Sequence, residues 1–513
     1  MSEEYVKIYD TTLRDGEQTP GVTLTPSNKT KIAIKLDKLG VDVIEVGFPI
    51  ISQGEMEATK QIVKQNLSCE ISGLARTEKK DIDAVINCDL KYVHTFIATS
   101  DIHLKYKLKK TRDEVLQKAI EAVEYAKSHG LMCEFSAEDS TRTDREFLKQ
   151  VYKQVVDAGT DRIDVPDTVG YSNPKYIDTL IRDLRTVVNV PISIHCHDDF
   201  GLAVANSLTA IEAGASCAHV TINGLGERAG NTSLEEFVMA SHCLYGKKTQ
   251  IKTKLLYEIS KIVSNLTGVV VQPNKAIIGE NAFGHESGIH THGVISNPLT
   301  YEPINPEMVG RKRWLEAGKH AGLHGISAML EEYGLIPSQE QLKEIVAKVK
   351  DLGDKGKHIT DADLLAIASQ IMRQEGLEQR IKLNDFVVTT GMNVVPTASV
   401  RLIIEGKEFT TADTGLGPVD AALKAIQKIT DKLANITLRE FKLESITGGS
   451  NALAEVSIKV EDKDGHIAST SAAGEDIVVT SLQAMINGLN RIMHKQAMNR
   501  NKNKDKELRK FTV

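Results

Sequence analysis

Residues 5–20 read Tyr5-Val-Lys-Ile-Tyr-Asp-Thr-Thr-Leu-Arg-Asp-Gly-Glu-Gln-Thr-Pro20. Val6 and Ile8 alternate with polar or amphipathic neighbours, which predicts a half-buried strand. Gly16 and Pro20 then interrupt this pattern. Charged and amide side chains lie between the strand and the break, although a turn needs only small or φ-tolerant residues. The stretch therefore predicts a functional site at the carboxyl end of a strand.

The alternation of short β-rich runs and longer amphipathic stretches continues to about residue 245. The predicted strands are residues 5–9, 41–47, 69–74, 92–97, 132–136, 162–165, 192–197 and 218–223. Helical stretches lie between them, for example residues 28–39, 112–128, 145–157 and 203–212. Eight strand–helix units of this length predict an α/β fold, a (β/α)8 TIM barrel. A doubly wound open sheet would also alternate, but no Gly-x-Gly-x-x-Gly motif follows the first strand.

Barrel topology predicts that reactive polar residues gather where the strands end. The sequence meets this expectation in all eight units. The residues in question are Asp15, Glu45, Arg76, His94, Glu138, Thr168, His195, His197, Glu227 and Asn231. Structural polar residues would not all fall on one rim of a barrel, so the set indicates an active site.

The chain after the barrel is expected to form further domains. We predict a catalytic barrel in residues 1–270, helical linker subdomains contributing to the active site in 271–384, and an α+β regulatory domain in 385–513. The last of these carries a strand-strand-helix pattern twice, which predicts an internal ββα repeat. Its glycine-bearing helix entrances, residues 414–420 and 471–475, are either plain turns or a site for a small ligand.

Composition restricts the classes of function. The chain has 513 residues, of which 41% are apolar and 26% charged, and a net charge of −6. An acidic protein with interspersed charges is not expected to bind nucleic acid as its main partner, because a phosphate backbone calls for a basic surface. No secretory signal and no long uncharged apolar run is evident, so we expect a cytoplasmic protein without a membrane partner.

His195-Cys-His197 is the sharpest local signal for a metal. Residues two apart on a strand share a face, so both imidazoles point the same way. Asp15 and Asn231 are the candidate oxygen ligands, although Asn231 has an alternative role as the cap of the following helix. Imidazole and oxygen ligands suit Mg²⁺, Mn²⁺ or Zn²⁺ and leave about two coordination positions for a chelating 2-oxo acid.

Three separated motifs resemble those of the family of 2-isopropylmalate, citramalate and homocitrate synthases. They are Asp10-Thr-Thr-Leu-Arg-Asp-Gly-Glu-Gln-Thr-Pro-Gly21, His195-Cys-His-Asp-Asp-Phe-Gly201 and Asn223-Gly-Leu-Gly-Glu-Arg-Ala-Gly-Asn231. Residues 46–49, 72–76, 93–98 and 165–170 look most like the archaeal type of 2-isopropylmalate synthase. The resemblance implies condensation of acetyl-CoA with 3-methyl-2-oxobutanoate, the first committed step to leucine. It also implies a homodimer and a last domain that binds leucine as an inhibitor.

The resemblance also implies roles for individual residues. Asp15, His195, His197 and Asn231 would hold the metal. His94, Ser136, Glu138 and Thr168 would surround the 2-oxo acid together with Arg14, which is also placed to stabilise the alkoxide. The remaining catalytic candidates are Glu227, His290 and Tyr301, of which His290 and Tyr301 would come from the partner subunit. Asp199 stands where many relatives have Asn, which would alter the hydrogen bonds next to the metal.

Other interpretations remain open on the sequence. The same chemistry on pyruvate would give citramalate, and on 2-oxoglutarate it would give homocitrate. A hydroxymethylglutaryl-CoA lyase or a pyruvate carboxylase domain shares the opening motif, although neither explains the C-terminal repeat. A metabolite sensor without catalytic activity would not need both Glu227 and His290.

Overall fold

The computed structural model describes residues 5–354, 359–372, 380–434, 436–445, 454–463, 467–474 and 476–510. The chain divides into two compact units. The first holds the chain up to Gly284 together with Glu302–Arg313. The second holds His285–Tyr301 and the chain from Trp314 onward.

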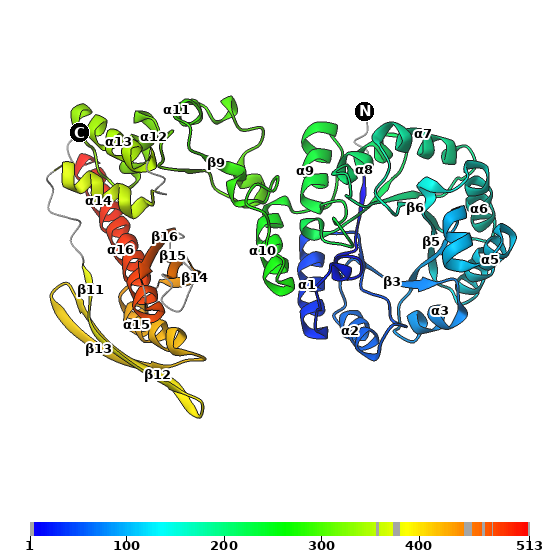
Figure 1. The fold of residues 1–513 in the computed structure, drawn as a ribbon, viewed down its shortest axis with the longest axis horizontal. Helices are drawn as coiled ribbons and strands as arrows, with labels where there is room; N and C mark the ends of the chain where they lie inside the picture. Colours follow the sequence, from blue (N-terminus) through cyan, green and yellow to red (C-terminus); the bar gives the residue numbers. More distant parts are fainter. Residues whose placement is uncertain are drawn as a thin grey trace. The chain divides into compact units, whose positions relative to one another are not determined.

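The first unit contains a closed parallel barrel in which each strand pairs with its neighbours in sequence order and β8 pairs with β1 (Figure 1). The TIM barrel predicted from the sequence is therefore confirmed. All eight predicted strands form, with bounds that differ by a few residues. The strands are β1 Lys7–Asp10, β2 Val43–Glu45, β3 Glu70–Arg76, β4 Tyr92–Ala98, β5 Met132–Glu138, β6 Arg162–Asp167, β7 Ile192–Cys196 and β8 Cys217–Val220.

Helices surround this barrel (Figure 1). Their ends follow from local sequence: the Thr25 side chain accepts a hydrogen bond from Asn28 N at the start of α1, and Gly40 ends α1 in the left-handed conformation. Ile32 and Leu36 of α1 are fully buried, which anchors the helix on the barrel. The helices are α1 Pro26–Leu39, α2 Gln53–Val63, α3 Lys79–Ile86, α5 Arg112–Ser128, α6 Arg145–Asp157, α7 Pro174–Arg185, α8 Ala203–Glu212, α9 Leu234–Tyr245 and α10 Leu256–Thr267.

The inside of the barrel holds a buried polar network. One oxygen of Glu134 accepts a hydrogen bond from Ser193 Oγ at 2.6 Å and lies 3.2 Å from His219 Nε2. The other oxygen accepts a hydrogen bond from the Tyr92 hydroxyl and lies 3.6 Å from Arg162. Charged groups in a barrel core require such partners, because burial without them is costly. The network therefore supports the barrel from inside.

The second unit begins with helices and ends in two similar halves. The helices are α11 Gly288–Ser296, α12 Leu323–Glu332, α13 Gln339–Asp354 and α14 Asp361–Ile371. Each half is an antiparallel three-stranded sheet followed by a helix that packs on it. The elements are β11 Ile381–Gly391, β12 Val394–Ile404, β13 Lys407–Thr414 and α15 Pro418–Ala434, then β14 Thr437–Ser445, β15 Ala454–Glu461, β16 Ile467–Gly474 and α16 Ile477–Lys510.

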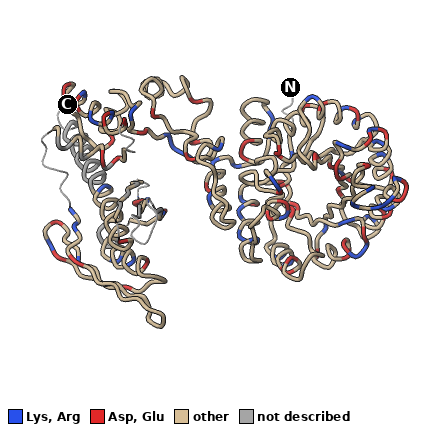
Figure 2. The backbone as a smooth tube through the Cα atoms, in the orientation of Figure 1, with Lys and Arg blue, Asp and Glu red and all other residues tan. Residues whose placement is uncertain are grey.

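The predicted internal repeat is present, with a third strand in each half that the sequence did not reveal. β13 reads Lys-Glu-Phe-Thr-Thr-Ala-Asp-Thr and β16 reads Ile-Ala-Ser-Thr-Ser-Ala-Ala-Gly. Neither sequence alternates apolar and polar residues as a half-buried strand does. Both strands lie at the edge of their sheet and contribute few large side chains to the core, so burial does not require that pattern. Within the described ranges, no helix combines the length and apolar character needed to cross a bilayer. Acidic and basic residues are interspersed along the barrel helices (Figure 2).

A buried lysine ties the first loop to the helices. Lys29 on α1 is fully buried, and its Nζ lies 2.7 Å from Glu17 Oε2 and 2.7 Å from Glu55 Oε1. We expect Lys29→Met to lower the free energy of unfolding by about 3 kcal/mol, because two carboxylates lose a buried cation. Lys35→Met on the same helix should cost less than about 1 kcal/mol, since the Lys35–Glu258 pair is partly exposed. Urea unfolding of both variants measures the difference, and equal losses would contradict the role of Lys29.

Candidate metal centre and active site

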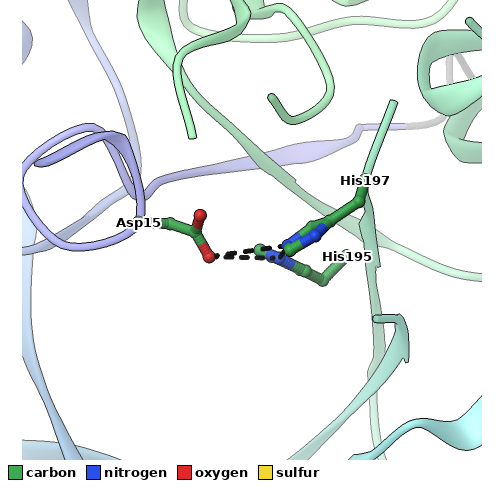
Figure 3. Close-up of side chains that lie close together, drawn as sticks. All are labelled: Asp15, His195 and His197. Atoms are coloured by element: carbon green, nitrogen blue, oxygen red, sulfur yellow. Dashed lines mark hydrogen bonds and ion pairs between the residues drawn. The ribbon is translucent and has the colours of Figure 1, made fainter. Parts of the chain in front are cut away.

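The four predicted metal ligands meet at the carboxyl rim of the barrel. Asp15 follows β1, His195 and His197 lie at the end of β7, and Asn231 lies in the loop between β8 and α9. The Nε2 atoms of the two histidines are 3.1 Å apart, and Asp15 Oδ2 lies 3.5 Å from one and 3.7 Å from the other. Figure 3 shows these three side chains pointing toward one another. Their ligand atoms all lie within 4.8 Å of one another, as ligands of one ion would.

The hydrogen bonding of Asn231 tests whether a metal fits between these side chains. Its Nδ2 donates to Asp15 Oδ1 at 2.9 Å and to Leu225 O at 3.1 Å, while its buried Oδ1 has no hydrogen-bond partner. A buried acceptor without a partner is costly unless another group, such as a cation, satisfies it. The N-cap of α9 is Ser233, so Asn231 does not take the capping role that the sequence left open. Two imidazoles, a carboxylate and an amide oxygen match a divalent metal.

The electrostatics of the rim prepare these groups for a metal. Burial opposes the charged form of Asp15, but the charge of Arg14 beside it outweighs this effect and holds the pKa of this carboxyl well below its usual range. Burial also lowers the pKa of His195 and of His197 below the ordinary histidine value. The site therefore presents a carboxylate and two neutral imidazoles, the forms that bind metals.

These shifts predict how metal binding depends on pH. Because the pKa of both imidazoles is lowered, protons compete with the metal only at a pH below the ordinary histidine value of about 6.5. We expect the dissociation constant for Mn²⁺ to change less than about threefold between about pH 7.5 and pH 6. Two histidines with ordinary pKa values would weaken binding about tenfold over the same range. Calorimetric titration at the two pH values measures this, and a tenfold loss would show that the shifts are absent.

Glu45 joins the predicted substrate-site residues Arg14 and His94, and His94 in turn contacts Ser136, although no individual role was predicted for Glu45. Arg14 donates from Nη1 to Asp15 Oδ2 at 2.5 Å and from Nε to Glu45 Oε2 at 2.6 Å. The other oxygen of Glu45 lies 2.6 Å from His94 Nδ1, and His94 Nε2 lies 2.6 Å from Ser136 Oγ. Arg14, His94 and Ser136 thus belong to one hydrogen-bonded chain that begins at Asp15.

Glu138 is the last residue of β5, and Thr168 directly follows the neighbouring strand β6. Glu138 is half-buried, and its Oε1 accepts a hydrogen bond from Lys107 Nζ at 2.5 Å. The Thr168 hydroxyl oxygen accepts a hydrogen bond from Asp139 N at 2.9 Å, next to Glu138. The structure therefore brings these two predicted residues to one part of the rim.

Arg228 is a rim residue that the sequence analysis missed. It adopts a positive φ of 55° between Glu227 and a run of small residues. Its guanidinium makes hydrogen bonds of 2.8 Å and 2.9 Å to the two oxygens of Asp199, and its Nη2 lies 2.6 Å from His197 Nδ1. Asp199 thus holds Arg228 against His197. Two features of the sequence could have predicted the Arg228–Asp199 pair. Asp199 stands where many relatives have Asn, and Arg228 lies in the Gly-Glu-Arg-Ala-Gly motif.

The remaining catalytic candidates fall in both compact units. Glu227 belongs to the barrel unit, where its backbone N–H lies 3.3 Å from Asp15 Oδ1 and its side chain is exposed. His290 on α11 and Tyr301 belong to the second unit. Their ring centroids are 4.2 Å apart, so these two predicted residues lie side by side within the second unit. Their approach to Glu227 stays a prediction.

The fold and the site define a (β/α)8-barrel protein with a candidate centre for a divalent metal. Comparison with known families agrees: residues 5–263 match the HMGL-like family. Residues 277–357 match the homocitrate synthase post-HMGL domain-like family, and residues 358–493 match the LeuA allosteric (dimerisation) domain.

Individual relatives give a narrower answer. The chain is 54% identical to a probable 2-isopropylmalate synthase of Methanopyrus kandleri, over 96% of this chain and 99% of that one. It is 55% identical to a 2-isopropylmalate synthase of Methanocaldococcus jannaschii, over 96% and 95%. It is also 49% identical to the (R)-citramalate synthase CimA of the same organism, over 95% and 100%. The chain belongs to the 2-isopropylmalate synthase family, whose members are acyltransferases.

Proposed function

We propose that this protein condenses acetyl-CoA with 3-methyl-2-oxobutanoate and water to give 2-isopropylmalate and CoA. The observation that carries the proposal is the meeting of Asp15, His195 and His197 beside Arg14 at the mouth of the barrel. The names of the most similar relatives support the same reaction.

The rim residues have complementary roles in this reaction. A divalent metal held by Asp15, His195, His197 and Asn231 would supply Lewis-acid polarisation of the ketone. Arg14 is anchored by two hydrogen bonds to carboxylates, which aim its guanidinium at the site where negative charge develops on the alkoxide. Glu45 carries the anchoring carboxylate on the barrel side, so the position of Arg14 is fixed before substrate binds.

Two proton transfers remain for other residues. The acetyl methyl group must lose a proton, and a water molecule must lose one when it attacks the thioester. We assign these steps to Glu227, His290 and Tyr301. The side chains of all three are exposed, so each can meet a substrate that enters from solvent. His290 and Tyr301 act, in this proposal, in the barrel of the partner subunit of a homodimer.

Citramalate synthesis from pyruvate is the second candidate. It is favoured by the relatives named citramalate synthase, which are 47% to 49% identical to this chain. The two oxo acids differ only in the alkyl group, and a pocket distinguishes such groups by about 1–3 kcal/mol. A few side chains around His94 and Ser136 therefore decide between the two substrates.

We further propose that leucine inhibits the protein by binding to the last domain. The match of residues 358–493 to the LeuA allosteric (dimerisation) domain supports both this regulation and the dimer. Of the two predicted helix entrances, residues 414–420 run from the last residue of β13 into α15, whereas residues 471–474 form the end of strand β16, and residue 475 lies outside the described residues. A cytoplasmic location fits a reaction that consumes acetyl-CoA.

A single assay tests the proposal. CoA release is measured with 3-methyl-2-oxobutanoate, pyruvate and 2-oxoglutarate, each with and without leucine. We expect kcat/KM to be at least about tenfold higher for 3-methyl-2-oxobutanoate than for pyruvate, as one or two extra methyl contacts allow. Leucine should lower the rate. Equal values for the two oxo acids would favour citramalate synthesis, and an unchanged rate with leucine would refute the regulatory proposal.

A further inference from the structure

Glu45 is a buried charged residue that no step of the proposed reaction uses. It lies on β2, is fully buried, and commits each carboxylate oxygen to a different residue. Oε2 accepts from Arg14 Nε and Oε1 faces His94 Nδ1, both at 2.6 Å. Such short charge-assisted contacts fix the geometry of both partners. Glu45 therefore connects the guanidinium beside the metal ligands to an imidazole deeper in the barrel.

The contact with Glu45 determines one proton of His94. Burial opposes ionisation of Glu45, but the charges of Arg14 and His94 outweigh it and lower the pKa of Glu45 to about 2. An ionised carboxylate offers only lone pairs. His94 Nδ1 must therefore carry a hydrogen and donate it to Glu45.

The opposite side of the imidazole determines the second proton. Ser136 Oγ lies 2.6 Å from His94 Nε2 and donates its only hydrogen to Asp164 Oδ2 at 2.5 Å. The lone pairs of Ser136 are then the groups that face Nε2. When Ser136 donates to Asp164 in this way, Nε2 also carries a hydrogen, and both ring nitrogens of His94 are donors.

We propose that Glu45 is a positioning residue that keeps His94 as an imidazolium ion and thereby locks the orientation of Arg14. In this arrangement a buried cation and a buried anion hold each other in place, and Arg14 cannot rotate away from the metal ligands without leaving Glu45 Oε2 without its partner. The effect on catalysis rests on the proposed condensation reaction, whereas the charge of His94 does not.

The other groups around His94 agree with this assignment. His94 is buried, with its ring centroid 6.1 Å from Tyr9 of β1 and 5.5 Å from His219 of β8. Burial acts to lower the pKa of His94, but Glu45 raises it, with Glu134 and Asp164 adding to the increase. In the competing arrangement, Ser136 gives its proton to Asp164 and takes one from His94 Nε2, which leaves His94 neutral. Burial favours this arrangement, because it raises the pKa of Asp164.

The charge of His94 is measured directly by ¹⁵N NMR of histidine-labelled protein without substrate. The signal of His94 is identified by its loss in the His94→Gln variant. We expect both ring nitrogens to be protonated from about pH 6 to about pH 8 in the wild type. In Glu45→Gln one proton should be lost below about pH 7, because burial is then no longer opposed by the carboxylate. A neutral His94 at about pH 7 in the wild type would overturn the proposal.

The consequence for turnover is measured by the pH profile of kcat. Glu45→Gln should lower kcat about 10- to 100-fold, the loss expected for hydrogen bonds to a charged group, and move the alkaline limb to lower pH. Glu45→Asp keeps a carboxylate and should recover part of kcat. Asp37→Asn removes a half-buried carboxyl on the outer helix α1, which accepts hydrogen bonds from Ser68 and Cys69, and should leave the profile unchanged.

These measurements separate the two proposals. If the wild type releases no CoA with any of the three oxo acids, the proposed function fails, and NMR still determines the state of His94. If the wild type is active and Glu45→Gln keeps its kcat and its pH profile, the positioning role of Glu45 is refuted. Melting temperatures of all variants exclude losses that come from unfolding.

Discussion

His195→Ala should reduce turnover by at least about 10³-fold and abolish tight binding of a divalent metal. The substitution removes one of three ligand atoms that lie within 4.8 Å of one another. It also leaves Asp15 and Arg14 without the group that completes the centre. The rate of CoA release and a titration with Mn²⁺ measure the two effects independently.

The fold should survive the same substitution. His195 lies at the end of β7, whereas the core of the barrel is built from many apolar side chains beneath it. Circular dichroism and the melting temperature measure this. His129→Ala is the matched control, because His129 is an exposed histidine of the same barrel unit whose side chain lies against Ser128 and Tyr125 of its own helix. Full activity in His195→Ala would refute the ligand assignment.

Mixed dimers should regain activity from two inactive variants. Glu227→Gln and His290→Ala each remove an exposed catalytic candidate from a different compact unit, so neither should disturb a core. If His290 acts in the partner's barrel, a mixed dimer has one site with both defects and one intact site. Random pairing of the two chains gives about half mixed dimers and therefore about a quarter of the wild-type activity.

The controls for this experiment are the single variants and the unmixed sample. Each variant alone should be at least about 10²-fold slower than the wild type, the contribution expected of a general acid or base. Mixing after purification should restore activity only as fast as subunits exchange. If His290 served its own barrel, every site in a mixed dimer would carry one defect, and no recovery would appear.

The fold of the barrel was predictable because its strands are short, apolar and separated by amphipathic helices. The strands β13 and β16 were not predicted, because their residues are mostly small or polar. Hydrogen bonding to the neighbouring strand, rather than burial of side chains, makes these segments strands. The helix α11, which begins at Gly288 and carries His290, was not predicted as a separate element. Its two histidines and two glycines hide the helical periodicity.

The candidate site also contains residues that could be predicted from the sequence and contacts that could not. His195 and His197 were predictable because a strand places alternate residues on one face, and Asp15 because β1 and β7 are separated only by β8 in a closed barrel. The Glu45–His94 contact was not predictable. It joins β2 and β4 across the barrel interior, and the stagger of the strands decides which side chains meet there. Arg228 depends on a backbone with positive φ, which the sequence of its loop does not determine.

A crystal structure with Mn²⁺, with the ion located by anomalous scattering, tests the central claim most directly. The account predicts one ion within about 2.0–2.4 Å of Asp15, of both Nε2 atoms of His195 and His197, and of Asn231 Oδ1. A second group of buried residues, Glu134, Asp164 and His219, also has ligand atoms close enough to share an ion. An ion bound there instead, or four rim groups too far apart to share one, would contradict the account.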